Sequence, residues 1–215
     1  MTQIPRTART KLHRASTRKS YDREAVYAAI DAAVVGHVDC AIDDTPYVTP
    51  TAMWREGDHV FWHAADSGRM AKHLAGGTTV CVTVTPFDGS VLARSAFHHS
   101  VNYRSVMAFG AAEPVDGAAA KMASRERFIE RLYPDRWQAI RQPDDAELAR
   151  TSVFRLALDE AVCQARTGPP VDHDADLSLQ GWAGTVPVER RFGVPVDAPD
   201  LNVHASPGVV GDGLN

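Results

Sequence analysis

The sequence predicts a mainly β fold: an antiparallel barrel, closed or nearly closed, of six to seven short strands with flanking helices. Three observations support this. Many short segments alternate apolar and polar residues, turn residues separate them, and helical periodicity is confined to a few insertions. The strands are too many and too closely spaced for a fold built from βαβ units. A chain of 215 residues fits one domain with extensions better than two.

The first third of the chain is predicted to form one helix followed by a run of strands. Residues 22–35 carry Val26, Ile30 and Ala33 at helical spacing, and Ser20 or Asp22 can cap the helix. The period then changes to two. The predicted strands, separated by Asp-rich and Gly-containing turns, are residues 36–42, 47–55 and 59–63.

The remaining elements follow the same reasoning. A short helix over 67–74 ends at two glycines, and residues 86–89 have the composition of a hairpin turn. A helical zone over 118–149 is broken by Pro134 and Pro143. The further strand-like segments are residues 78–85, 90–97, 101–110 and 152–166.

Charge is distributed unevenly along the chain. Residues 1–19 carry six basic and no acidic side chains, and the whole chain has a formal net charge of −4, which leaves −10 for the remainder. A basic start can indicate nucleic-acid contact or a transit peptide, but a flexible solubilising arm is the simpler interpretation. The acidic body argues against a nucleic-acid platform.

Cysteine usage and hydropathy favour a cytoplasmic location. Cys40, Cys81 and Cys163 are odd in number and far apart, and we expect them to be reduced and mostly buried. No apolar run is long enough to span a bilayer, and the residues after Met1 do not resemble a signal peptide.

Several common site types are absent. The sequence has no Rossmann or P-loop glycine motif, no zincin motif and no nucleophile elbow. His59 and His63 have the spacing of a helical metal pair, but on a strand their rings are about 13 Å apart. His98 and His99 are adjacent and point to opposite faces of a strand. We therefore expect no metal site.

The segment 66–70 is the best candidate for an anion site. A strand ends at His63, a polar bend containing Ser67 follows, and a helix begins. Free N–H groups at a helix start attract an anion, and Arg69 can add a bidentate clamp that suits a phosphate. The alternative is a capped surface helix with a solvated arginine.

Residues 47–51 form the second candidate. Pro50 lies inside a strand pattern, where it cannot donate to the ladder, so it marks an edge or a bulge. Backbone groups freed there can bond the edge of a flat heterocycle; the alternative is a plain edge strand. The third candidate, residues 97–105, is densely polar at a strand entry. It either lines a ligand cavity or forms a satisfied hydrogen-bond network.

These residues resemble a known family. The order of 47–51, 68–70 and the stretch 94–105, with 166–170 and 181–184 later, is similar to the pyridoxamine 5′-phosphate oxidase-like flavin-nucleotide-binding proteins, to which the nitroimidazole reductases are related. The similarity covers residues 21–188. It implies a split β-barrel, a homodimer, and FMN held in a cleft between the subunits.

The resemblance also implies residue roles. Val48, Thr49, Pro50 and Thr51 would lie along the flavin ring and ribityl chain. The end of the strand at His63 and the bend with Ser67, Arg69 and Met70 would surround the phosphate. Ser105 would approach the flavin from the next strand, and Trp182 is a late aromatic near the ring.

Two departures from the family pattern matter. The family usually has Arg-Lys where this chain has Arg69-Met70, so one phosphate cation is missing. Lys72 or Arg104 is a candidate replacement. The residues that bind pyridoxamine phosphate near the C-terminus have no clear counterpart, so that substrate is not expected.

The predicted function is an FMN-dependent oxidoreductase acting on a small molecule, with His98 or His99 as the candidate catalytic proton donor. The alternatives are a haem-binding split barrel, since the histidines offer axial ligands, and a flavin-binding dimer without catalysis. The predicted organisation is a basic arm at 1–19, a split-barrel flavin-binding domain at 20–190, and a C-terminal arm or disordered tail at 191–215.

Overall fold

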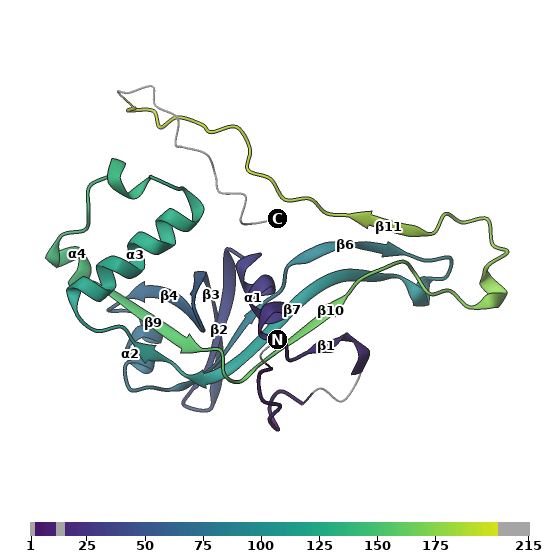
Figure 1. Cartoon of the computed structure of the whole chain (residues 1–215), viewed down its shortest axis with the longest axis horizontal. Helices are drawn as coiled ribbons and strands as arrows, with labels where there is room; N and C mark the ends of the chain where they lie inside the picture. The colour runs from purple at the N-terminus through teal and green to yellow at the C-terminus, as the bar shows by residue number, and fades with distance from the viewer. Residues whose placement is uncertain (1–2, 12–15, 202–215) are drawn as a thin grey trace.

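The computed structural model describes residues 3–11 and 16–201. It shows a mainly antiparallel sheet curled into a half-barrel, with a few flanking helices and a long arm of strands projecting from the body (Figure 1). The predicted fold class, a mainly β antiparallel barrel, is confirmed. Residues 1–2, 12–15 and 202–215, which belong to the predicted N-terminal arm (1–19) and C-terminal arm (191–215), lie outside the described residues.

The elements are as follows. The helices are α1 (Arg23–Asp31), α2 (Arg69–Leu74), α3 (Ala118–Leu132) and α4 (Asp145–Ala149). The strands are β1 (Lys19–Ser20), β2 (Val35–Ile42), β3 (Thr45–Glu56), β4 (His59–Ala65), β5 (Thr79–Val84), β6 (Phe87–Leu92), β7 (Ser100–Ala111), β8 (Glu113–Pro114), β9 (Thr151–Ala157), β10 (Ala161–Arg166) and β11 (Gly184–Pro187). Short 3-10 turns cover Ser16–Arg18, Ala96–His98, Trp137–Ala139 and Asp174–Asp176.

The sheet curls because each of its two longest strands, β3 and β7, pairs with different strands along its length. The strand order is β1-β10-β7-β5-β2-β3-β4-β9-β8, and β6 joins β7 and β11 beside it. The first half of β3 pairs with β2, from Thr45 opposite Ile42 to Ala52 opposite Val35, and its second half pairs with β4. β7 likewise pairs with β6 near its start and with β5 near its end. The twist accumulated along such strands closes the sheet on itself.

The main core lies inside the curl. Met53, Trp62, Phe154 and Leu156 are almost completely buried there, and Val26 of α1 packs on the same cluster. The Asp22 side chain accepts a hydrogen bond from the N–H of Glu24 and so caps α1, as predicted. The helix is shorter than the predicted 22–35, because Val35 already belongs to β2.

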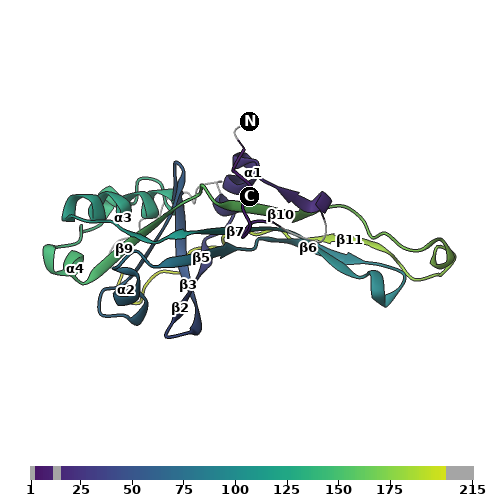
Figure 2. The same ribbon diagram turned by 90° about the horizontal axis from the view of Figure 1, so that it is seen from below.

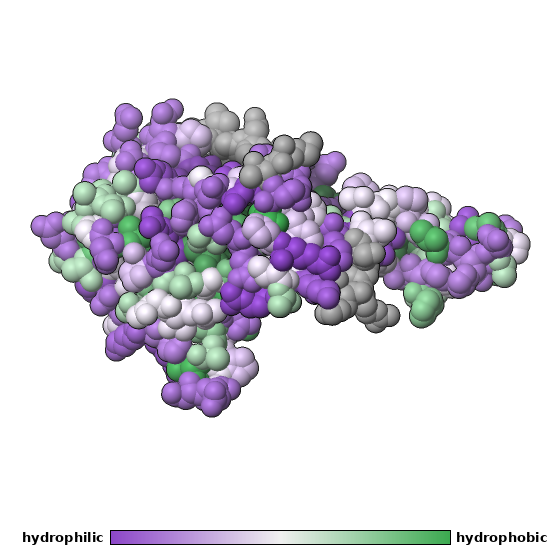
Figure 3. All heavy atoms as spheres, turned by 60° about the horizontal axis from the view of Figure 1, so that its bottom comes forward, coloured by the Kyte–Doolittle hydropathy of each residue, from purple (hydrophilic) through white to green (hydrophobic). Residues whose placement is uncertain are grey.

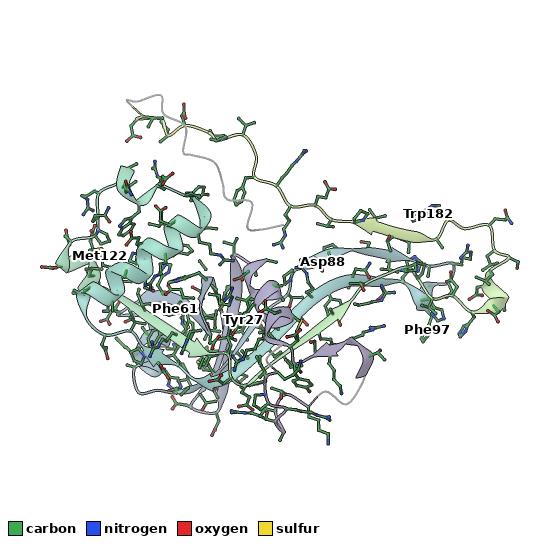
Figure 4. All side chains as sticks on the ribbon, viewed as in Figure 1. Tyr27, Phe61, Asp88, Phe97, Met122 and Trp182 are labelled. Atoms are coloured by element: carbon green, nitrogen blue, oxygen red, sulfur yellow. The ribbon has the colours of Figure 1, made fainter. Side chains whose placement is uncertain are left out.

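A second, smaller core lies on the outer face of the same strands. Trp54 and Phe61 alternate with the inward residues of β3 and β4, and α3 covers them through Phe128 (Figure 4 labels Phe61). Arg131 of α3 donates hydrogen bonds to the carbonyl oxygens of Met53 and Ala33, at 3.0 and 3.2 Å. These bonds tie the helix to the sheet and fix its distance from β3 and β4.

The projecting arm, which consists of β6, the start of β7, the segment that follows β10, and β11, is the main departure from the predicted path of the chain. Residues 86–89 do not form the expected hairpin turn. Val84 pairs with Val106 and Phe87 pairs with Tyr103, so β5 and β6 follow one another along β7 in the same direction. Gly89 has a φ of 154°, and a Cβ there would lie 2.6 Å from the carbonyl oxygen of Val186. The glycine therefore allows β11 to approach closely, and it does not form a turn.

Two other strand predictions are corrected. Residues 152–166 form a hairpin of β9 and β10 instead of one segment, because residues 158–160 turn the chain between them. β4 runs two residues beyond the predicted end at His63, since Ala64 and Ala65 pair with β9.

Both end segments contact the body where they are described. Ile4 is buried in the main core, and Arg9 pairs with Glu160. After β11 the chain returns over the body, where Arg190 donates a 2.7 Å hydrogen bond to the carbonyl of Ala32 (Figure 2 shows the arm and this return from below). The domain boundaries at 19 and 190 stay a prediction.

Candidate functional site

The first half of β3 is an open edge of the sheet. β2 pairs with its residues 45–52 on one side, but β4 begins to pair only at Met53. The interpretation of Pro50 as an edge marker is thus confirmed. Val48, which is 58 % exposed, faces outward, whereas Thr49 faces inward with Val38. Backbone N–H and C=O groups along this edge have no strand partner and can bond a flat heterocycle.

A cavity of about 280 Å³ lies between this strand and α2. Its wall includes Cys40, Tyr47, Thr49, Arg69 and Met70. The structure thus brings together Thr49, Arg69 and Met70, three of the residues to which the family resemblance gives flavin contacts. The thiol of Cys40 is buried, and burial raises its pKa, so it enters the wall as a neutral group.

Arg69 is the free cation of this cavity. Its guanidinium stacks over the Tyr47 ring at 4.8 Å, and no ion pair is formed by it among the described residues. α2 begins at Arg69 rather than at Ser67, so Ser67 lies in the bend before it. Gly68 makes the bend tight: its N–H donates to the carbonyl of Ala65, and a Cβ on Gly68 would lie 2.9 Å from that oxygen.

The second cation of the family pattern is absent from this position. Met70 is half-buried and packs against the main core. Arg104, a candidate replacement, makes two hydrogen bonds to the Asp88 carboxylate at 3.1 and 2.7 Å, and these raise its pKa. Lys72 is exposed on α2 and makes no ion pair within the described part of the chain.

A second and larger cavity, of about 590 Å³, lies beneath α3 and α4 at the ends of β4 and β9. His63, Arg125, Trp137 and Arg150 contribute to its wall. The His63 side chain faces this cavity and packs on Trp54 and Phe128, so it does not point toward the Arg69 side. Its Nδ1 atom is buried without a hydrogen-bond partner among the described residues.

The charges around this cavity are mostly positive. Glu147 forms two hydrogen bonds with Arg141, and these lower the pKa of Glu147 to about 2. Arg125 and Arg150 make no ion pair within residues 3–11 and 16–201. Sequence reasoning assigned 118–149 only as a helical zone and missed the cavity. The available signal was the group of arginines on either side of Trp137, of which Arg125, Arg141 and Arg150 lie in the cavity wall.

Burial lowers the pKa of His63, and the nearby Arg125 charge lowers it further. Neutral His63 therefore stabilises the fold fully above the unfolded pKa of about 6.5, and this contribution is lost as pH falls through the lower folded value. We expect NMR titration to find His63 titrating below an ordinary histidine, and Arg125→Ala to move its pKa part of the way back. An unshifted His63 in both proteins would contradict this geometry.

The arm holds the remaining candidates. The Arg94 side chain pairs with Asp172 at 2.9 Å, and Arg166 is buried with hydrogen bonds to Gly168 and Pro169 carbonyls. The polar stretch is thus largely a hydrogen-bond network that holds the loop after β10. His98 is an exception, because its Nε2 is buried without a partner among the described residues and its ring meets that of His173 at 4.6 Å.

The other predicted residues on the arm are separated from Arg69. His99 Nδ1 lies 2.9 Å from the Ser95 carbonyl oxygen, and the Ser105 hydroxyl donates to the Gln164 carbonyl on β10. Trp182 is 65 % exposed on the arm, at the end of the molecule that lies away from α3 and α4 (Figure 4). A single chain therefore does not bring the arm residues and the Arg69 cavity into one site.

Two kinds of feature are absent from the described residues. No group of three or more His, Cys, Asp or Glu side chains is arranged to hold a metal ion. In the same ranges, no helix has the length and apolar character needed to cross a membrane.

Comparison with known proteins gives one family and two similar whole chains. The family model described as pyridoxamine 5′-phosphate oxidase matches residues 22–164. The flavocytochrome Anf3 from Azotobacter vinelandii is 36 % identical, with a TM-score of 0.87 over 97 % of this chain and 95 % of that one. The FAD and haem binding protein from Mycobacterium smegmatis is 32 % identical, with a TM-score of 0.83 over 88 % and 93 %.

A more distant structure shows the fold alone. A protein described as a 5-nitroimidazole antibiotic resistance protein, from Bacteroides thetaiotaomicron, is 19 % identical, with a TM-score of 0.57 over 67 % of this chain and 84 % of that one. A search of curated protein sequences gave no match.

Proposed function

The chain belongs to the pyridoxamine 5′-phosphate oxidase family, and on that premise we propose that it is a flavoprotein that binds the FMN unit at the open edge of β3. One observation carries the proposal. An edge strand with free backbone groups lies beside a cavity whose arginine has no acidic partner among the described residues. This pairing suits a ligand with a flat polar heterocycle at one end and a phosphate at the other.

The residues present fit such a group. Backbone atoms of residues 47–51 would bond the ring edge, with Val48 and Pro50 on the outward face of the strand. Arg69 would hold the phosphate, and the Ser67 hydroxyl in the bend would add a donor. When bound, the flavin supplies redox chemistry that no side chain provides.

We propose that the protein works as a homodimer through its arm. Large apolar side chains are exposed on the arm and appear as green areas on it in the space-filling view (Figure 3). They are Phe87, Phe97, Val101, Val171, Leu177, Leu179, Trp182 and Val186. Such a surface favours burial against another chain, and a second copy would bring arm residues to a neighbouring Arg69 cavity.

Phe97→Ser is expected to weaken the dimer, because Phe97 is a large apolar side chain of this surface and is 88 % exposed. Light scattering after gel filtration should give about twice the 23.3 kDa chain mass for the unaltered protein and a lower mass for the variant. Val196→Ser, at a similarly exposed position on the tail, serves as the control. A monomeric unaltered protein that still binds flavin tightly would refute the dimer.

The proposed activity is oxidoreduction of a small molecule. Anaerobic mixing of the flavin-loaded protein with NADH or NADPH should bleach the flavin, and an added acceptor should restore its colour. His98→Ala should slow turnover if this histidine supplies the proton. A bound flavin that neither nucleotide reduces would favour a flavin-binding dimer without catalysis.

Haem is a second candidate, favoured by the Nε2 of His98, which is buried and has no hydrogen-bond partner in the part of the chain that the structure describes. The two whole-chain relatives are described as a flavocytochrome and as an FAD and haem binding protein. We propose that His98 would hold the iron of a haem bound at the arm. Haem titration should then give a Soret shift that His98→Ala abolishes and His99→Ala retains. Loss of the shift in His99→Ala alone would instead assign the iron to His99, whose Nδ1 contacts the Ser95 carbonyl and so leaves Nε2 free.

A further inference from the structure

We propose that the cavity beneath α3 and α4 binds a phosphate group carried on an aromatic body, as in an adenosine phosphate. The cavity volume of about 590 Å³ is in the usual range for small-molecule sites. The cavity is separate from the Arg69 cavity, since the two share no wall residue.

Hydrogen bonds within the protein hold the wall of this cavity in place. Glu130 of α3 accepts hydrogen bonds from the N–H groups of Asp135 and Trp137, at 2.7 and 2.6 Å. Gln142 donates to the Trp137 carbonyl, and a capping box of Asp144 and Glu147 begins α4. These bonds fix the turn that carries Trp137, so the cavity keeps its shape without a ligand.

The polar side of the cavity is suited to an anion. Arg125 is half-buried on the α3 side. Arg150 is exposed and directly precedes β9. Neither makes an ion pair in the described part of the chain. Arg125 lines the same cavity as His63 and Glu147. Burial is the main cause that lowers the pKa of His63, and the Arg125 charge lowers it further. The unpartnered Nδ1 of His63 adds a buried polar atom in the same wall.

The apolar side of the cavity is suited to a flat body. Trp137 is only 8 % exposed, and Ile129, Ile140 and Leu148 complete this wall. An inorganic anion alone would not use this apolar side of the cavity. A ligand that joins a phosphate to an aromatic ring uses both sides.

Two sources can supply this chemistry. The cavity includes His63, Ala64 and Ala65, and the chain passes directly from Ala65 through the bend to Arg69. A dinucleotide whose FMN unit lies at the β3 edge can therefore place its adenosine phosphate here; this version rests on the proposed function. The other source is a free nucleotide or aryl phosphate, which needs no flavin.

AMP binding by calorimetry tests the site, with Arg125→Ala as the variant. Arg127→Ala is the matched control, because Arg127 lies on the same helix but pairs with Glu56 and does not line the cavity. We expect Arg125→Ala to weaken AMP or FAD binding about tenfold or more, and Arg127→Ala to change either less than about twofold. Arg150→Gln should act in the same direction as Arg125→Ala.

The choice of ligand separates the two sources. If the site holds half of a dinucleotide, Arg125→Ala weakens FAD but leaves FMN binding unchanged, and AMP competes with FAD but not with FMN. If the ligand is free, AMP binds equally well to the FAD-loaded protein. The proposal is overturned if both AMP and FAD bind equally to the unaltered protein and Arg125→Ala, or if neither binds at all. Failure of FMN to bind, with AMP binding intact, would instead refute only the flavin proposal.

Discussion

Arg69→Ala is expected to weaken FMN binding by about 1.5–3 kcal/mol, the range for a hydrogen bond to a charged group. This corresponds to about a 10- to 150-fold rise in Kd. The effect should be large because Met70 stands where the family has a second cation, so Arg69 has no neighbouring substitute in the cavity wall. Fluorescence titration of FMN against the flavin-free protein measures it.

Arg69→Lys provides the matched comparison. It keeps the charge but loses the planar fork, so we expect a smaller loss than with alanine. Lys72→Ala tests whether the exposed lysine on α2 takes over the missing role; a comparable loss there would assign it to the phosphate. Unchanged FMN affinity in Arg69→Ala would remove this arginine from the site.

Phe154→Ala should destabilise the fold by about 3–5 kcal/mol, the usual cost of emptying a large aromatic site in a core. Phe154 is 1 % exposed in β9 and stacks on Trp62 with ring centroids 5.8 Å apart. For a chain of this length the melting temperature should fall by about 6–20 °C. Urea denaturation gives the free energy of unfolding.

Val196→Ala is the control for this stability prediction. Val196 is 94 % exposed on the tail, so its truncation should change the free energy of unfolding by less than about 0.5 kcal/mol. A loss below about 1 kcal/mol for Phe154→Ala would mean that the inside of the curled sheet is not packed as described.

Strand periodicity predicts the barrel well because burial on one face imposes a two-residue alternation. β2 shows this clearly: Gly36, Val38 and Cys40 are buried, and the residues between them are not. The hairpin predicted at 86–89 is wrong for the opposite reason. Asp88-Gly89 has the local composition of a turn, but the glycine is required by the close approach of β11, which lies nearly a hundred residues further along the chain.

The candidate site likewise has a part that the sequence predicts and a part that it does not. The open edge at Pro50 is readable from sequence because proline lacks the N–H that a central strand needs. The cavity beneath α3 and α4 is not, because its wall joins β4 to a helical insertion separated from it by more than fifty residues. The sidedness of His63 also depends on register: Met53 pairs with Trp62, which places both inside and turns His63 outward.

The absorption spectrum of the purified protein, before and after incubation with FMN and FAD, tests the central claim most directly. We predict the two bands of an oxidised flavin at close to one flavin per chain, either as purified or after reconstitution and removal of free cofactor. An additional Soret band would support the haem proposal as well. A colourless protein that retains neither FMN nor FAD would contradict the account.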